Sequence, residues 1–313
     1  MVTMSGIRDA WAALRGVTHI TPLITSRTLD HLAGARVFLK AENFQRTGSF
    51  KLRGAYNLLR LGDFSRGVVT ASSGNHGAAL AYAAGRLGIA ARVVMPVDAP
   101  AAKVAAARSY GAEVELYGKT SPERQQRAQE LADRQGLGYA HSYDDPRIIA
   151  GQGTVALEVL DQLPDVDMMV VPVGGGGLIS GVAVCCKEST PRVRVTGVEP
   201  SGADRMTRSL QAGRCREVPH VNTLADGLRV KLPGELTFEY VRRLVDQVVT
   251  VTDEEILCAM RFLFERCKLV VEPSGAAALA AVLSGKVAPG QKVAVVLSGG
   301  NVELGRLGEL FSA

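Results

Sequence analysis

Three short apolar runs in this chain each end in small and polar residues that could bind a ligand. The run 68–70 leads into ASSGNHG at 71–77, the run 168–173 into four glycines, and the run 292–297 into SGGN at 298–301. In parallel α/β sheets, ligands bind beyond the carboxyl ends of the strands. If the runs are such strands, the three turns mark one shared crevice.

The four consecutive glycines, Gly174, Gly175, Gly176 and Gly177, favour an anion site. Without a Cβ atom, successive backbone N–H groups can surround an anion, and the predicted helix over 178–187 adds the positive end of its dipole. A tight turn without a ligand is the alternative, but a turn does not need four glycines. A phosphate is the expected guest. The patterns GxxxxGK[ST] and GxGxxG are absent here, which disfavours nucleotide triphosphates and dinucleotides.

One lysine, Lys51, has neighbours that suit covalent chemistry. It lies in TGSFKLRG at 47–54, where Phe50 and small residues predict a partly apolar pocket early in a helix. Desolvation lowers the pKa of an amine and makes it a nucleophile toward aldehydes. A single lysine is more often a surface charge, so the interpretation depends on the predicted phosphate loop and on the SSGNHG turn.

Strand-like runs alternate with helical patterns along the whole chain, which predicts an α/β fold of mostly parallel, twisted sheets covered by helices. Helices are expected over 78–87 and 122–134, and Thr252 with Glu255 fits a capping box. The stretch 141–153 is loop-like at its start and glycine-punctuated at its end, and it is a candidate for one crossing between domains. The strand-like runs are 37–40, 68–70, 92–95, 113–117, 168–173, 195–198, 248–251 and 292–297.

Composition limits the function classes. The chain has 313 residues, 47% hydrophobic and 21% charged, with a net charge of +5 and no run of like charges, so we expect a globular protein of one large or two ordinary domains that does not bind nucleic acid. Its histidines and cysteines form no HExxH, CxxC or Cys/His cluster, so no metal site is predicted. Because no signal peptide and no 18-residue apolar stretch is present, we expect no membrane partner and a cytoplasmic location.

The motifs together resemble those of the pyridoxal-5′-phosphate (PLP) fold-type-II family, in the branch of threonine/serine dehydratases (ammonia-lyases) and serine racemases. The resemblance spans nearly the whole chain. It rests on GSFKLRGA (48–55), SSGNHG (72–77), AGQGT (150–154), GGGGL (174–178), EPSGAD (199–204), ADG (225–227), VEPSGA (271–276) and LSGGN (297–301).

The resemblance implies a role for each matching residue. Lys51 would be catalytic and bind the cofactor as a Schiff base, and Ser73 would be the catalytic serine on the opposite face of the ring. Phe50 would pack near the ring, Asn75 would bind the 3′-oxygen, and Ser298 would meet the pyridine nitrogen. Residues 174–177 with Leu178 would hold the phosphate, and Ser72, Ser73, Asn75 and His76 would receive the substrate carboxylate.

It also implies a tryptophan synthase β-like fold with two domains. The large PLP-binding domain would comprise residues 1–41 and 147–313, the small domain residues 42–146, and the chain would form a homodimer. The implied activity is PLP-dependent dehydration of a β-hydroxy amino acid, L-threonine or L-serine, to a 2-oxo acid and ammonia. A serine racemase-type or β-replacement enzyme is the alternative, followed by a non-catalytic PLP-binding protein.

Three residues depart from the family pattern. Arg205 stands where metal-binding relatives have an acidic residue after EPSxAD, and we expect it to pair with Glu199 in place of a cation. Tyr143 replaces an asparagine of some relatives. Arg229 either reads an acidic substrate side chain, as in 3-hydroxyaspartate, or is a solvated surface charge.

Overall fold

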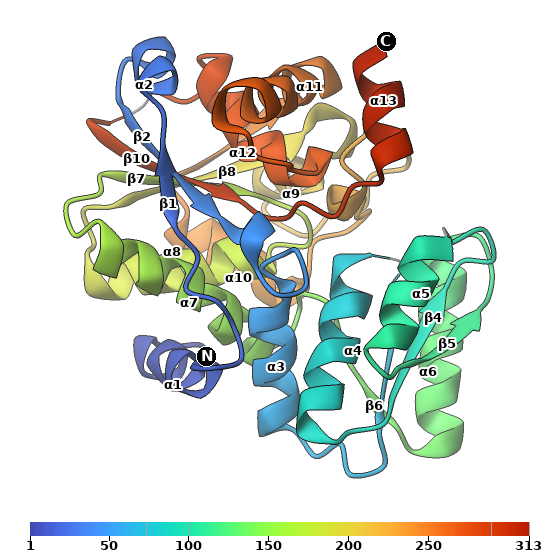
Figure 1. Cartoon of the computed structure of the whole chain (residues 1–313). Helices are drawn as coiled ribbons and strands as arrows, with labels where there is room; N and C mark the ends of the chain where they lie inside the picture. Colours follow the sequence, from blue (N-terminus) through green and yellow to red (C-terminus); the bar gives the residue numbers. More distant parts are fainter. Residues whose placement is uncertain (73, 100, 289, 313) are drawn as a thin grey trace.

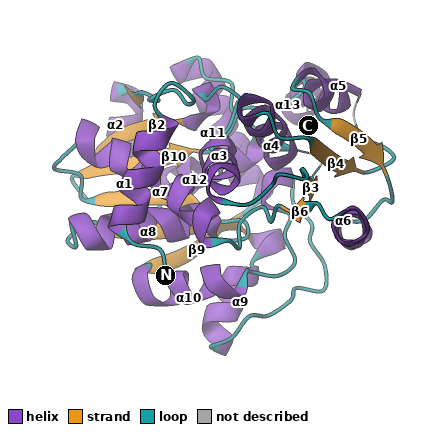
Figure 2. Cartoon of the chain, turned by 90° about the horizontal axis from the view of Figure 1, so that it is seen from below, coloured by secondary structure: helices purple, strands orange, loops and turns teal. Residues whose placement is uncertain are grey.

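The computed structural model describes residues 1–72, 74–99, 101–288 and 290–312, which form two sheets with helices around them. Figure 1 shows the smaller sheet and its helices gathered on one side of the molecule, with helix α3 (Lys51–Leu61) between them and the larger sheet. Figure 2 shows the same separation from below. The expected α/β class is therefore confirmed.

The larger sheet has six strands in the order β1-β2-β10-β7-β8-β9, of which only β1 is antiparallel to its neighbour. The order is not sequential: β10, from the end of the chain, lies between β2 and β7. Because β7 and β10 are parallel, the turns that follow them lie at the same edge of the sheet. The strands are β1 (Leu23–Thr25), β2 (Arg36–Ala41), β7 (Met168–Pro172), β8 (Arg194–Pro200), β9 (Gln247–Val251) and β10 (Lys292–Leu297).

Both faces of this sheet are buried. In β10, Ala294 and Val296 lie in one core and Val293 and Val295 in the other, as strand alternation requires. Residues from α1 (Met4–Leu14), α7 (Pro146–Gln162), α8 (Gly177–Ser189) and α10 (Glu235–Leu244) form the first core, and residues from α2 (Arg27–Ala33), α11 (Asp253–Phe262), α12 (Pro273–Leu283) and α13 (Leu304–Ser312) line the second.

The smaller sheet has four parallel strands in the order β5-β4-β3-β6. Residues of α3, α4 and α5 form the core on one face, and α6 covers the other. The elements are β3 (Val68–Ala71), α4 (Asn75–Leu87), β4 (Ala91–Met95), α5 (Ala101–Ser109), β5 (Glu113–Leu116), α6 (Ser121–Gln135) and β6 (Gly138–Tyr139).

All eight strand-like runs form strands, and the capping box of Thr252 and Glu255 is present at the start of α11. The stretch 141–153 is a loop at its start, as expected, and α7 begins at Pro146. The glycines there serve helix packing: a Cβ on Gly151 would lie 2.5 Å from the Arg53 carbonyl oxygen in α3, and one on Gly153 would lie 2.9 Å from that of Gly181 in α8. Within the described chain, no helix is both long and apolar enough to cross a membrane.

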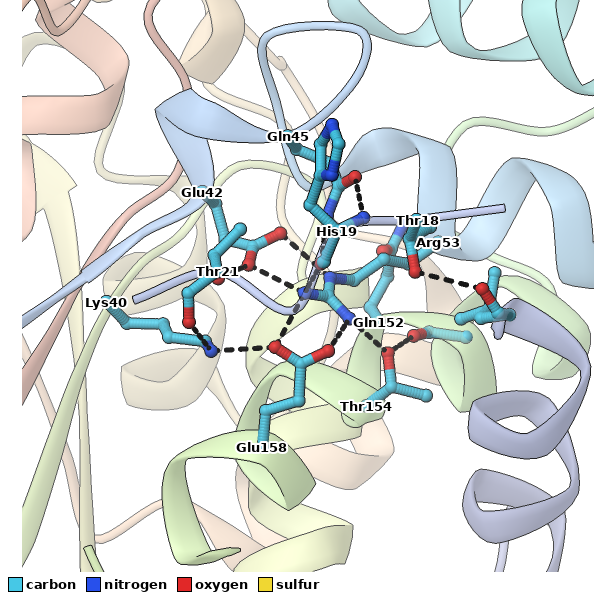
Figure 3. A network of polar contacts seen from close by, with 12 residues as sticks. Thr18, His19, Thr21, Lys40, Glu42, Gln45, Arg53, Gln152, Thr154 and Glu158 are labelled. Carbon is cyan, nitrogen blue, oxygen red and sulfur yellow. Dashed lines mark hydrogen bonds and ion pairs between the residues drawn. The ribbon is translucent and has the colours of Figure 1, made fainter. Parts of the chain in front are cut away.

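A buried cluster of charged residues joins α3 to β2 and α7 (Figure 3). The cluster consists of Lys40, Glu42, Arg53 and Glu158, whose side chains are at most 3% exposed. Arg53 donates to Glu42 Oε2 at 2.8 Å and to Glu158 Oε1 at 2.6 Å, and Lys40 donates to Glu158 Oε2 at 2.7 Å. Burial opposes the charge of Arg53, but the two carboxylates outweigh it and raise its pKa. Two positive and two negative charges therefore balance where no water reaches them.

Replacing Arg53 by Met should strongly destabilise the protein, because buried Glu42 would lose the cation it is bonded to and buried Glu158 would lose one of its two. We expect the free energy of unfolding to fall by about 3–5 kcal/mol. The matched control is Arg60→Met in the same helix, whose partner Asp9 is 62% exposed and where the loss should be only about 0–1 kcal/mol. Denaturant unfolding of both variants measures the difference, and equal losses would contradict the role of the cluster.

Candidate active site

Lys51 is the first residue of α3, and its amine lies inside the molecule. Its Nζ atom donates to the carbonyl oxygen of Ser142 at 2.9 Å and lies 5.2 Å from the centre of the Phe50 ring. The segment before it is attached to the end of β10: Phe50 N donates to Ser298 O at 3.1 Å, and Ser49 forms a bridge with Gly299. The lysine is therefore held at the edge of the larger sheet.

The electrostatics of this position favour a neutral amine. Burial lowers the pKa of Lys51 to about 8. Burial also lowers the pKa of His76 to about 3, with the charge of Lys51 as the next cause, so this imidazole is neutral and does not act as a competing cation. At pH 7 about a tenth of the Lys51 amine is then unprotonated and able to act as a nucleophile, far more than of a solvated lysine.

The SSGNHG turn follows β3 and opens α4. Ser72 accepts from Gly74 N at 3.3 Å, while Asn75 and His76 are the first two residues of the helix. Ser73, expected to be catalytic and to bind substrate, lies outside the described residues, so its role stays a prediction. The turn therefore places Asn75 and His76 on the side of the smaller sheet.

The Asn75 amide is held by partners from distant parts of the chain. Its oxygen accepts from Asn301 Nδ2 at 2.8 Å, its nitrogen donates to Glu272 Oε1 at 2.6 Å, and Asn301 Nδ2 also donates to Thr47 O at 2.8 Å. These bonds fix which end of the amide carries the hydrogens. One of its two N–H groups remains for a ligand such as the 3′-oxygen expected from the resemblance.

Glu272 has a role that the sequence reasoning missed, although VEPSGA was among the matching motifs. The residue is 4% exposed, and burial followed by the charge of Asp226 raises its pKa to about 8. A Cβ on Gly299 would lie only 2.6 Å from Glu272 Oε1, so glycine is needed where the β10 turn passes this carboxyl. Glu272 is therefore a mostly protonated acid at neutral pH that orients Asn75.

The glycine loop runs from the end of β7 into α8, as predicted, and residues 175–178 are buried. Among the hydrogen bonds of the described residues, none is donated by the backbone N–H groups of residues 175–178. Gly176 has φ +99°, a backbone angle that residues other than glycine rarely adopt. Buried N–H groups are nearly always paired, so this row of donors fits a phosphate well.

Tyr143 connects the lysine to the glycine loop. The ring lies directly on Gly175, where an added Cβ would come within 2.2 Å of Tyr143 Cγ, and the hydroxyl donates to Leu232 O at 3.3 Å. The preceding residue, Ser142, accepts the hydrogen bond from Lys51. One short segment therefore contacts both the candidate nucleophile and the candidate phosphate site, which the sequence reasoning had noted only as a departure at Tyr143.

Ser298 directly follows β10, whose last residue is Leu297, and is 4% exposed. Among the hydrogen bonds of the described residues, its hydroxyl takes part in one, a long bond of 3.5 Å to Ser274 O, while its backbone carbonyl accepts from Phe50 N. A hydroxyl with such a weak partner can turn to another acceptor or donor. The residue thus fits the predicted contact with a ring nitrogen, and that contact stays a prediction.

Arg205 pairs with Glu199, as expected. The two side chains are fully buried with 3.4 Å between Nη1 and Oε1, and the same guanidinium donates to the carbonyl oxygen of Ala203. Glu199 also accepts from Met206 N at 3.0 Å and from Thr207 N at 2.8 Å. The donors expected to bind a cation in metal-dependent relatives are thus occupied by a guanidinium, and they do not fit a divalent ion. The described residues contain no cluster of three His, Cys, Asp or Glu side chains suited to a metal.

Arg229 follows the Gly227–Leu228 segment that lines the glycine loop: an added Cβ on Gly174 would lie 3.3 Å from Gly227 O. The Arg229 side chain is exposed, and its Nε donates to Thr223 O at 2.8 Å. Among the hydrogen bonds of the described residues, none is donated by the other two guanidinium nitrogens of Arg229. Both interpretations of this residue are therefore compatible with its position.

The lowered pKa of Lys51 predicts how its reactivity depends on pH. Only the unprotonated amine attacks an aldehyde, so the initial rate of imine formation should rise with pH, with a midpoint at about 8. The rate is measured by visible absorbance after adding pyridoxal to the cofactor-free chain. A Lys51→Ala variant provides the background, and a midpoint near that of a solvated lysine, about 10.4, would contradict the burial argument.

Comparisons with known proteins agree with this geometry. A family model described as "Pyridoxal-phosphate dependent enzyme" matches residues 14–299. The chain is 45% identical to an L-threonine ammonia-lyase of Thermotoga maritima, covering 100% of this chain and 79% of the relative. It is 44% identical to an L-threo-3-hydroxyaspartate ammonia-lyase of Pseudomonas sp, covering 95% of each.

A solved structure of maize serine racemase superimposes with a TM-score of 0.95 at 41% identity, over 99% of this chain and 97% of that one. The buried lysine, the unpaired N–H groups of the glycine loop and these full-length similarities lead to the same conclusion. The chain belongs to the family of pyridoxal-phosphate dependent enzymes, with the fold-type-II architecture.

Proposed function

We propose that this enzyme is a dehydratase, or ammonia-lyase, that converts a β-hydroxy amino acid such as L-threonine or L-serine to a 2-oxo acid and ammonia. The observation that carries the proposal is the Lys51 amine, which is buried, has a pKa of about 8, and is linked through Ser142 and Tyr143 to the glycine loop. The similarity to ammonia-lyases over the full chain supports the choice of reaction.

The cofactor supplies an aldehyde that condenses with amines and a ring that withdraws electrons from the substrate α-carbon. Lys51 would hold that aldehyde, and its amine would take the α-proton of a bound substrate as a general base. The β-hydroxyl would take up a proton and leave as water, and hydrolysis of the resulting enamine would consume one water and release ammonia. Threonine would thus give 2-oxobutanoate, with atoms balanced.

The other site residues orient the reactants. Asn75 has one free N–H group because Asn301 and Glu272 hold the rest of its amide. The N-terminal turn of α4, with Ser72 and His76, provides backbone donors for the substrate carboxylate. Ser298 offers a hydroxyl and no carboxylate to the ring nitrogen, which favours β-elimination over transamination because less negative charge is drawn into the ring.

The remaining features of the proposal concern organisation. We assign residues 1–41 and 147–313 to a large domain and 42–146 to a small domain, in line with the two sheets. A cytoplasmic homodimer is the expected form. A racemase-type enzyme is the second candidate, favoured by the likeness to maize serine racemase.

Product analysis over a panel of substrates tests the function. We expect L-threonine and L-serine to yield 2-oxo acid and ammonia, measured by coupled reduction of the 2-oxo acid. A Lys51→Ala variant is the control and should yield none. D-serine as the main product would contradict the dehydratase and support the racemase, and a chain that binds PLP without any product would be a binding protein.

The same panel decides the role of Arg229. If its guanidinium reads a second carboxylate, kcat/KM for L-threo-3-hydroxyaspartate should exceed that for threonine. Without such a preference, Arg229 is a surface charge.

The ion pair of Arg205 and Glu199 predicts that activity does not require a divalent cation. Treatment with EDTA should leave the rate of 2-oxo acid formation unchanged, because a guanidinium already occupies the Glu199 carboxylate and the Ala203 carbonyl. Magnesium added afterwards serves as the control and should have no effect. Loss of activity in EDTA with recovery in magnesium would show this interpretation of the ion pair to be wrong.

A further inference from the structure

The carbonyl groups of the glycine loop are each held by a donor. Gly174 O accepts from the Arg205 guanidinium, with Nε at 3.2 Å and Nη2 also bonded. Gly175 O accepts from the Thr237 hydroxyl at 2.6 Å, and Gly176 O accepts from Ser180 N at 3.0 Å. Three successive peptide groups are therefore fixed in orientation through their oxygens.

The orientation of these oxygens determines that of the N–H groups. In a planar trans peptide, the C=O of one residue and the N–H of the next point in opposite directions. The bonds to Gly174 O and Gly175 O therefore turn the N–H groups of Gly175 and Gly176 away from Arg205 and Thr237. These are two of the N–H groups that have no partner among the described residues.

Several contacts hold the Arg205 side chain in place beside the glycine loop. Its side chain is fully buried and also donates to the carbonyl oxygens of Val173 and Ala203. It begins helix α9 (Arg205–Ala212), and the ion pair with Glu199 fixes the guanidinium beside the loop. A fixed positive charge behind a row of N–H donors strengthens their attraction for an anion.

We infer that Arg205 and Thr237 are positioning residues that orient the N–H groups of Gly175 and Gly176 toward the cofactor phosphate. The inference rests on the proposed function, because it takes PLP as the ligand of the loop. Arg205 acts through the peptide groups and its charge, and Thr237 through one hydroxyl. Their removal should therefore weaken binding of the phosphate and not of the aldehyde.

The test compares PLP with pyridoxal, which has the same aldehyde and ring but no phosphate. Full-length wild type, Arg205→Met, Thr237→Val and Arg208→Met are purified with cofactor, stripped with hydroxylamine and titrated with each aldehyde. Arg208 lies one turn further along α9, with a 57% exposed side chain paired with Asp204, and is the matched control. The ³¹P NMR shift of the bound phosphate is recorded for each reconstituted protein.

We expect Arg205→Met to weaken PLP binding by about tenfold or more, as for loss of charge-assisted hydrogen bonds. Thr237→Val, which removes only a hydroxyl, should weaken it by about fivefold. Both should leave the Kd for pyridoxal unchanged and move the ³¹P shift, while Arg208→Met should resemble wild type.

An equal loss of affinity for PLP and pyridoxal would overturn the inference, as would unchanged PLP binding in folded variants. If Arg205→Met does not fold by circular dichroism, Thr237→Val and Arg205→Lys decide in its place, and the lysine variant should bind PLP with intermediate affinity. If wild type releases 2-oxo acid and the variants keep full PLP affinity, the proposed function stands and only the role of Arg205 and Thr237 is rejected. Failure of wild type to bind PLP would reject the proposed function itself.

Discussion

The buried charge cluster of Lys40, Glu42, Arg53 and Glu158 is the constraint on which the site depends. Arg53 is two residues from Lys51, in the first turn of α3, and its guanidinium is bonded to carboxylates from the end of β2 and from α7 (Figure 3). A helix that begins at the boundary between two sheets would otherwise be free to shift with either one. The ion pairs attach its first turn to the larger sheet, so the Lys51 amine keeps a fixed position relative to the turns after β7 and β10.

Burial acts in opposite ways on the two titratable groups nearest the expected ring. It lowers the pKa of Lys51 and raises that of Glu272, each to about 8, so both tend toward their neutral forms. Near pH 7, burial therefore leaves Glu272 mostly neutral and gives Lys51 a larger neutral fraction than a solvated lysine has. Arg205 is a fully buried cation beside the glycine loop, and it lies on the side where the peptide oxygens of the loop point.

Much of the fold could be predicted because its signals are local. Apolar runs of strand length, the capping box at Thr252 and the glycines at 174–177 are each visible within a few residues, and the runs all became strands. Gly151 and Gly153 resemble turn residues in sequence, but in the structure they let α3 and α8 approach α7. Such a need depends on a neighbour more than 25 residues away, which no local pattern reports.

The same limit applies to the site. The residues expected to contact the cofactor were found in short motifs, but those that hold them come from elsewhere: Glu272 and Asn301 for Asn75, and Arg205 and Thr237 for the glycine loop. The Arg205–Glu199 pair was expected from the family resemblance, because Arg205 stands where metal-binding relatives have an acidic residue after EPSxAD. Nothing in the sequence near Thr237 indicated its bond to Gly175, because 62 residues separate them.

The segment from Ser142 to Asp144 makes three different contacts with three consecutive residues. Ser142 accepts from Lys51, Tyr143 covers Gly175, and Asp144 accepts from Thr237 N in the first turn of α10 at 3.1 Å. A single inserted or deleted residue here would misalign all three contacts at once, whereas a substitution would remove at most one, and none at Ser142, whose contact is made by its backbone carbonyl. The length of this segment is therefore under a stricter constraint than the identity of its residues, and lineages that diverge in its side chains should still agree in its number of residues.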